Sequence, residues 1–147
     1  ANIFSALEQR KDLNHNEKLK ELDSLLGDFD LRELSKTLGI KLSGGERRRT
    51  EIARSVASNP KFILLDEPFA GIDPIAVSDL KKIIHSLNKK GIGVVISDHN
   101  VRDTMNICSK VLIINKGKII ANGEPSEIAN DKLVREIYLG QDFETEL

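Results

Sequence analysis

The first 58 residues carry apolar side chains at helical spacing. Leucines recur in this way through residues 1–38, which predicts two or three short helices separated by a polar loop at Asp12–Asn16. A further helix is predicted over residues 46–58, and Asn59-Pro60 ends it. The leucines of the front part are Leu19, Leu22, Leu25, Leu26, Leu31, Leu34 and Leu38. The inner face of the further helix carries Ile52, Ala53, Val56 and Ala57.

The middle of the chain changes to short, continuous apolar runs. Phe62–Leu65 is such a run, ended by Asp66-Glu67-Pro68, and Gly93–Ser97 is a second one. A short unbroken run between helix breakers is typical of a strand buried on both faces. The stretch Ala76–Lys90 between the two strands predicts a helix whose inner side carries Val77, Leu80, Ile84 and Leu87. Strand, helix and strand in this order predict a parallel sheet with a right-handed crossover.

The last third begins with a short predicted helix and a β-hairpin. The helix has Val101, Met105 and Cys108 on one side. Two apolar stretches, Val111–Ile114 and Lys118–Ala121, flank Asn115-Lys116-Gly117, a pattern that favours a hairpin. A final helix is predicted to begin at Pro125-Ser126 and to contain Ile128, Val134 and Ile137. The fold class is therefore expected to be α/β, with a parallel sheet, flanking helices and a C-terminal hairpin.

Composition agrees with an ordinary globular domain. The 147 residues are 39% apolar and 31% charged, with a formal net charge of -1, which gives no argument for a nucleic-acid partner. A single cysteine, Cys108, excludes an internal disulfide framework. The three histidines and Cys108 show no metal-ligand spacing, and His15 and His85 are expected on the surface.

The stretch Leu42–Glu46 allows two interpretations. Ser43 and Glu46 form a capping box at a helix start, which explains those two residues but not the intervening Gly44 and Gly45. Glycine costs a helix interior about 0.8–1 kcal/mol relative to alanine. Bare backbone at the positive end of a helix lets N–H groups approach a phosphate, so these residues also fit an anion-binding site. Both interpretations can hold together.

The carboxylates Asp66 and Glu67 follow the first predicted strand directly. Ligands of open parallel sheets bind beyond the carboxyl ends of the strands. One carboxylate there can hold Mg²⁺, and the other can orient or deprotonate a water. The simpler alternative is a strand end that turns into solvent.

His99 ends the second predicted strand, so it is expected at the same sheet edge, where it could contact a ligand phosphate rather than serve as a structural histidine. Arg47-Arg48-Arg49 fits a solvated helix face better than a nucleic-acid site, because no aromatic residues interleave with it. Asp73-Pro74 looks like a turn that leads into the next helix.

These motifs together resemble the nucleotide-binding subunit of ABC transporters. Leu42–Glu46 is similar to the family's signature, and Phe62–Glu67 to its Walker B strand followed by the catalytic glutamate. Ala70–Asp73 looks like the D-loop, and His99 looks like the switch histidine. The resemblance implies a partial P-loop ATPase fold in which residues 1–58 form the helical signature subdomain, 59–123 the C-terminal part of the RecA-like core and 124–147 a helical tail.

The resemblance also implies a mechanism that uses ATP and Mg²⁺. Glu67 is expected to be the general base, Asp66 the Mg²⁺ partner and His99 a γ-phosphate contact. The signature residues Ser43, Gly44, Gly45 and Glu46 are expected to bind nucleotide across a head-to-tail dimer with a second copy, and Asp73 to communicate across that dimer. Integral membrane transporter subunits are the other implied partners, which places the protein at the cytoplasmic face of the inner membrane.

Within the family, the chain looks most like the subunits that power lipopolysaccharide export. The stretches that suggest this are Leu42–Ala53, Asp66–Pro74, Asp98–Arg102 and Tyr138–Phe143. A branched-chain amino acid importer ATPase and a non-catalytic regulatory module derived from such ATPases are the alternatives. No G-x-x-x-x-G-K-[ST] loop occurs in residues 1–147, so we expect a fragment that lacks the phosphate-cradling loop and is inactive alone.

Overall fold

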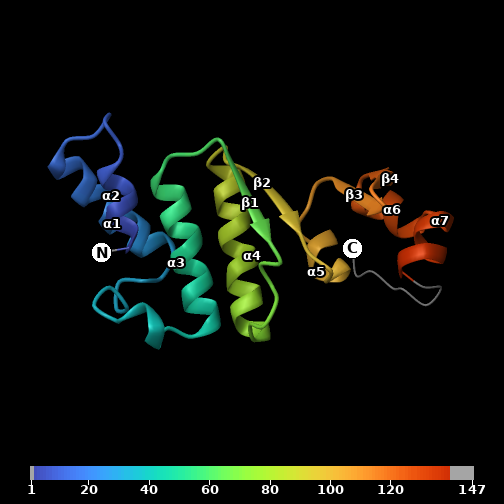
Figure 1. Cartoon of the computed structure of the whole chain (residues 1–147), viewed down its shortest axis with the longest axis horizontal. Helices are drawn as coiled ribbons and strands as arrows, with labels where there is room; N and C mark the ends of the chain where they lie inside the picture. The colour runs from blue at the N-terminus through green and yellow to red at the C-terminus, as the bar shows by residue number, and fades with distance from the viewer. Residues whose placement is uncertain (1, 140–147) are drawn as a thin grey trace. The chain divides into compact units, whose positions relative to one another are not determined.

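The computed structural model describes residues 2–139, and it is an α/β structure as predicted (Figure 1). The chain divides into two compact units, Ala1–Ser97 and Asp98–Leu147. The first contains α1 (Asn2–Glu8), α2 (His15–Asp28), the 3-10 turn η1 (Gly39–Lys41), α3 (Gly44–Ala57), β1 (Phe62–Asp66), α4 (Pro74–Lys89) and β2 (Gly93–Ser97). The second contains α5 (Val101–Met105), β3 (Val111–Asn115), β4 (Lys118–Gly123), α6 (Pro125–Asn130), α7 (Lys132–Val134) and the π-helical turn η2 (Arg135–Leu139).

The front of the first unit is a small helical cluster in which α1, α2 and α3 pack on one another. Helix α2 begins inside the stretch predicted as a loop, because Asn14 caps it in a capping box with Glu17. The leucine pattern was wrong as a helix signal beyond residue 30, where the chain forms turns instead. The core of this cluster consists of Ile3, Leu7, Leu25, Phe29, Leu31, Ile52, Ala53 and Ala57.

Strands β1 and β2 pair in parallel, from Phe62 opposite Gly93 to Asp66 opposite Ser97. Both strands and the helix between them lie where the sequence predicted them, to within two residues. Helix α4 packs on this sheet (Figure 1). Its inner side residues Leu80, Ile84 and Leu87 are buried.

The prediction that these strands are buried on both faces is wrong for the described residues. In β1 buried and exposed residues alternate, with Ile63 and Leu65 inside while Phe62 and Leu64 are 68% and 78% exposed. Val95 of β2 is also exposed. One face of the sheet is therefore covered in the described structure and the other is open.

The second unit is built on the β3–β4 hairpin. Lys116 and Gly117 both have positive φ, which is the backbone of a two-residue type I′ turn. Met105, Ile113, Ile128, Ala129 and Val134 form its core. The single final helix was predicted wrongly, because Asp131 adopts an extended backbone and caps a new turn through the N–H of Val134. Residues 140–147 of the predicted tail lie outside the described residues.

None of the helices between residues 2 and 139 is long and apolar enough to cross a membrane. The predicted division into three parts at residues 58 and 123 stays a prediction. It separates parts by their role within an ATPase, whereas the two compact units are defined by contacts within the chain.

Candidate functional site

Ser43 caps helix α3, as the first interpretation of this stretch predicted. Its hydroxyl accepts from the Glu46 N–H at 3.3 Å, and the Glu46 carboxylate accepts from the Ser43 N–H at 2.8 Å. The hydrogen bond from the Ser43 N–H holds the pKa of Glu46 below its ordinary value. The carboxylate therefore lies at the positive end of α3 in its charged form.

The two glycines after Ser43 lie against the chain segment that begins α4. A Cβ added to Gly45 would lie 2.6 Å from the Cβ of Ala76. A Cβ added to Gly44 would lie 3.2 Å from Cγ2 of Ile72 and 3.4 Å from the Gly71 carbonyl oxygen. Packing therefore gives these glycines a reason that neither interpretation of the sequence contained.

The carboxylates Asp66 and Glu67 lie at the carboxyl end of β1, as predicted, and both are exposed. The Ser97 hydroxyl donates to Oδ1 of Asp66 at 2.5 Å, and the Glu67 N–H donates to the Ser97 carbonyl oxygen at 2.7 Å. Parallel pairing thus continues one residue past β1 and fixes the backbone of both acidic residues against β2. Buried Pro68 and Phe69 then anchor the chain that follows.

Glu67 has a positive φ of 43°, which is uncommon for a residue with a side chain. Backbone strain of this kind persists only when the surroundings hold it, and it concentrates at functional sites. The Glu67 carbonyl oxygen accepts from the Ala70 N–H at 3.2 Å and from Arg48 Nη2 at 3.3 Å. Both contacts stabilise the turn that carries Glu67.

Asp73 is the N-cap of α4, and its Oδ1 accepts from the Ala76 N–H at 2.9 Å. Pro74 occupies the first helical position, where its missing N–H costs nothing. The predicted turn into a helix is confirmed.

His99 belongs to the second unit and is described within it. Its side chain is 73% exposed, and Nδ1 lies 3.7 Å from Oδ1 of Asp98, whose side chain is 1% exposed. The same Asp98 oxygen accepts from the Asn100 N–H at 2.8 Å, which stabilises the turn before α5. The predicted meeting of His99 with Asp66 and Glu67 at one sheet edge stays a prediction.

A single carboxylate beside a hydroxyl suits Mg²⁺, which keeps several waters and often uses only one or two protein carboxylates. Asp66 and Ser97 supply such a pair at the end of the sheet. Residues 2–139 contain no cluster of three or more His, Cys, Asp or Glu side chains that would hold a metal alone. A carboxylate and a hydroxyl of this kind can hold an ion that completes its coordination with water or with a phosphate ligand.

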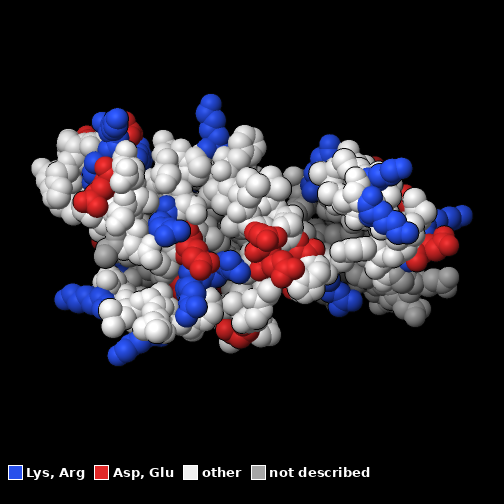
Figure 2. All heavy atoms as spheres, viewed as in Figure 1, with Lys and Arg blue, Asp and Glu red and all other residues white. Residues whose placement is uncertain are grey.

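Sequence reasoning missed two residues of this region, Ser97 and Arg48. Ser97 could have been found, because the parallel register puts it opposite Asp66. Arg48 was assigned to a solvated helix face, yet its guanidinium contacts both Glu51 and the Glu67 backbone. Figure 2 shows acidic and basic side chains side by side in the middle of the molecular face in view.

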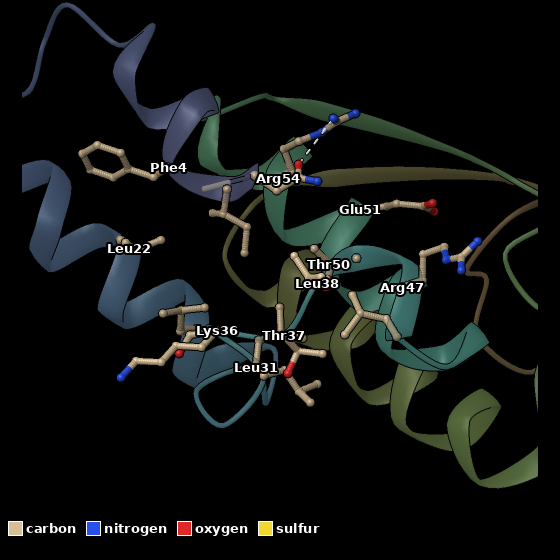
Figure 3. Close-up of a pocket in the computed structure, with 17 residues that line it drawn as sticks. Phe4, Leu22, Leu31, Lys36, Thr37, Leu38, Arg47, Thr50, Glu51 and Arg54 are labelled. Atoms are coloured by element: carbon tan, nitrogen blue, oxygen red, sulfur yellow. Dashed lines mark hydrogen bonds between the residues drawn. The ribbon is translucent and has the colours of Figure 1, made fainter.

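A cavity of about 700 Å³ lies in the helical cluster, apart from the acidic pair (Figure 3). Apolar side chains from α1, α2 and the following turns line it, among them Phe4, Leu22 and Leu31. Lys36, Arg47 and Arg54 contribute positive charge to the same lining, and Glu51 contributes one negative charge. Its lining does not include Asp66, Glu67 or Asp73, so it is a feature separate from the predicted catalytic residues.

Comparison with known proteins places these features in a family context. Residues 2–70 match the ABC transporter family, and residues 118–144 match the branched-chain amino acid ATP-binding cassette transporter family. The lipopolysaccharide export system ATP-binding protein LptB of Haemophilus influenzae is 53% identical over 142 residues, which cover 97% of this chain and 59% of that protein. The Escherichia coli K12 protein of the same name is 49% identical with the same coverage.

Solved structures agree with this relationship. The structure of cbiO1 from Clostridium perfringens, part of the ABC transporter complex cbiONQ, has a TM-score of 0.79 and 28% identity, and the match covers 96% of this chain and 58% of that one. A nucleotide-free ATP-binding cassette from an ABC transporter gives a TM-score of 0.78 at 26% identity, with 96% and 64% coverage. The chain spans 59% of the length of each of the two lipopolysaccharide export relatives named above.

Proposed function

Because this chain belongs to the ATP-binding subunits of ABC transporters, we propose that it forms part of an ATP-hydrolysing subunit that powers lipopolysaccharide export. The observation that carries this proposal is the acidic pair Asp66 and Glu67, held at the carboxyl end of β1 in the same compact unit as Ser43–Glu46. Ser43–Glu46 is the N-cap and first turn of α3, and it is called the Ser43–Glu46 loop below. Identity of about half the residues to lipopolysaccharide export ATPases supports the cargo.

Glu67 is the proposed general base toward the water that attacks the γ-phosphate. Its backbone has a positive φ, and its carbonyl oxygen accepts hydrogen bonds from Ala70 and Arg48. A backbone fixed in this way supports the role, because catalysis of phosphoryl transfer depends on positioning. Asp66 is the proposed Mg²⁺ partner, with Ser97 orienting its carboxylate. Mg²⁺ bound there would neutralise charge that develops on the phosphates. His99 is the proposed γ-phosphate contact, and its side chain is 73% exposed.

The proposed partners are a second copy of the subunit and integral membrane transporter subunits. Ser43, Gly44, Gly45 and Glu46 would contact nucleotide held by the other copy, and Asp73 would contact that copy directly. The N-terminus of α3 supports the first contact, because its positive end attracts phosphate. The subunit would then lie on the cytoplasmic face of the inner membrane.

The cavity of the helical cluster is our proposed contact for the membrane subunits. Its apolar lining and the charges of Arg47 and Arg54 suit an apolar helix that carries an acidic residue. Leu22→Lys should weaken association of the complete subunit with its membrane partners and leave the ATPase activity of the isolated subunit intact. Unchanged association would contradict this contact.

The first experiment is ATP hydrolysis by the complete natural subunit that contains these residues, beside its Glu67→Gln variant. We expect Mg²⁺-dependent hydrolysis that the variant loses while it still binds ATP. A complete subunit that binds no ATP would favour a non-catalytic module instead.

The cargo needs a separate test, because residues 118–144 match the branched-chain amino acid transporter family. We expect the complete subunit to restore surface lipopolysaccharide in a bacterium depleted of its own export ATPase. Restoration of leucine uptake in an importer-deficient strain, without the first effect, would favour the importer assignment.

A polypeptide limited to residues 1–147 should bind ATP weakly and should not hydrolyse it. No phosphate-cradling loop motif occurs among these residues, and that loop normally supplies the backbone amides and the lysine. Equilibrium binding of a fluorescent ATP analogue and phosphate release test this. Saturable hydrolysis that depends on Glu67 in this polypeptide would overturn it.

A further inference from the structure

We infer that Ala76 is a positioning residue for the Ser43–Glu46 loop, and that this loop and the start of α4 form one packed joint. The inference rests on the proposed function, because the activity that it explains is ATP hydrolysis by the complete subunit. The joint depends on the size of the side chains at two facing positions, Gly45 on α3 and Ala76 on α4.

The contact between Gly45 and Ala76 leaves no space for a second methyl group. A Cβ on Gly45 would lie 2.6 Å from the Ala76 Cβ, well inside the van der Waals distance of two carbon atoms. Gly45 is buried, and α3 and α4 lie side by side (Figure 1). The pair thus carries one methyl group in total, and Ala76 supplies it.

Gly44 makes the second contact of the joint. Ile72 Cγ2 and the Gly71 carbonyl oxygen lie 3.2 Å and 3.4 Å from the position of an added Cβ. Two consecutive glycines therefore lie against two points of the segment 71–76. A single contact would leave the loop free to pivot, whereas two contacts fix its direction as well as its distance.

Both sides of the joint are held by their own helix caps. Ser43 and Glu46 cap α3 reciprocally, and Asp73 caps α4 through the N–H of Ala76 itself. Ala76 thus packs against Gly45 through its methyl group and donates its backbone N–H to the Asp73 carboxylate. Because packed surfaces transmit displacement instead of absorbing it, a shift of Asp73 moves the Ser43–Glu46 loop with it.

This arrangement explains the two glycines differently from phosphate access. Access alone would require small residues in the loop but would place no demand on position 76. The joint requires that the combined size at positions 45 and 76 be that of one glycine and one alanine. Exchanging the two residues tests this difference, because it preserves the total volume and puts the methyl group on the loop.

The experiment is a double-mutant cycle of Gly45→Ala and Ala76→Gly in the complete natural subunit, with kcat, KM for ATP and the unfolding midpoint measured for each protein. Gly45→Ala should lower kcat about tenfold or more, since small misplacements at a site have effects of that order. It should also lower the unfolding midpoint by about 2–4 °C or more. The double variant should recover most of both losses, which is the signature of a direct contact.

Gly39→Ala is the matched control for the midpoint, because nothing lies within 4 Å of a Cβ there. It should leave the midpoint unchanged or raise it slightly, because alanine loses less conformational freedom on folding than glycine does. Ala76→Val, which enlarges the other side of the contact, should lower kcat while Gly45 is intact.

A double variant that regains its midpoint but stays as inactive as Gly45→Ala would overturn the inference, since the glycine would then serve the nucleotide and not the joint. A double variant that recovers neither quantity would also overturn it. If the unaltered complete subunit hydrolyses no ATP, the proposed function fails, and the midpoints still decide whether the joint exists.

Discussion

The guanidinium of Arg48 on α3 donates to the backbone carbonyl oxygen of Glu67 at the end of β1, with 3.3 Å between Nη2 and the oxygen. The same guanidinium donates to Oε2 of Glu51 at 3.2 Å. The bond to Glu67 joins the helix that carries the Ser43–Glu46 loop to the turn that carries the proposed base. It therefore links two motifs that are far apart in the sequence.

Arg48→Ala should reduce catalysis more than stability. Loss of the hydrogen bonds of Arg48 to Glu67 and to exposed Glu51 should lower the free energy of unfolding by about 1 kcal/mol in total, because the exposed pair contributes little. Loosening of the Glu67 turn should lower kcat of the complete subunit about tenfold. Glu51→Ala is the control, because it removes the other partner of Arg48 and leaves the Glu67 bond in place. Equal effects of both variants on kcat would show that the bond to Glu67 has no role in positioning.

The positive φ of Glu67 predicts that replacing this residue by glycine can raise stability while it abolishes activity. Glu67→Gly should leave the free energy of unfolding unchanged or raise it by up to about 1 kcal/mol, because glycine adopts this backbone without strain. Glu67→Ala keeps the strain and should gain nothing. Both variants should lose ATP hydrolysis by the complete subunit, and denaturant unfolding separates them. A less stable glycine variant would argue that the side chain itself holds the turn.

Glu46 predicts a loss of stability at low pH. The hydrogen bond from the Ser43 N–H lowers its pKa in the folded state, so the folded protein binds the proton less readily than the unfolded chain does. The stabilisation is therefore present above the ordinary pKa of a glutamate, and it is lost as the pH falls through the lowered folded-state value. Glu46→Gln should make the unfolding midpoint less dependent on pH in the acid range. An identical pH profile for the variant would contradict the capping box as the cause.

Local patterns predicted most of the elements because their causes are local. The apolar run of β1 and the turn at Lys116-Gly117 follow from neighbouring residues, and so does the position of Asp66 and Glu67 at a strand end. The faces of β1 could not be assigned in this way, since burial depends on what packs against a strand.

The missed features depend on long-range contacts or on a local competition. The fit of Ala76 against Gly45 and the bond from Arg48 to Glu67 join residues distant in sequence, so no spacing rule reveals them. At Asp131 the apolar pattern favoured a continuous helix, whereas the aspartate side chain favoured a helix cap. The cap prevailed, so one helix ends at this residue and the next begins there.

The hairpin of the second unit gives a test of local backbone energetics that is independent of nucleotide. Lys116 has a φ of 48° and Gly117 one of 75°, and only glycine occupies such backbone without strain. Lys116→Gly should therefore raise the free energy of unfolding, and Gly117→Ala should lower it by about 1 kcal/mol or more. Lys118→Gly is the matched control: it also replaces an exposed lysine by glycine, but within β4, where added backbone freedom should lower stability. Chemical denaturation of the complete subunit measures all three. Equal effects of the two lysine replacements would mean that the turn backbone stores no strain, and that the lysine side chain alone determines the outcome.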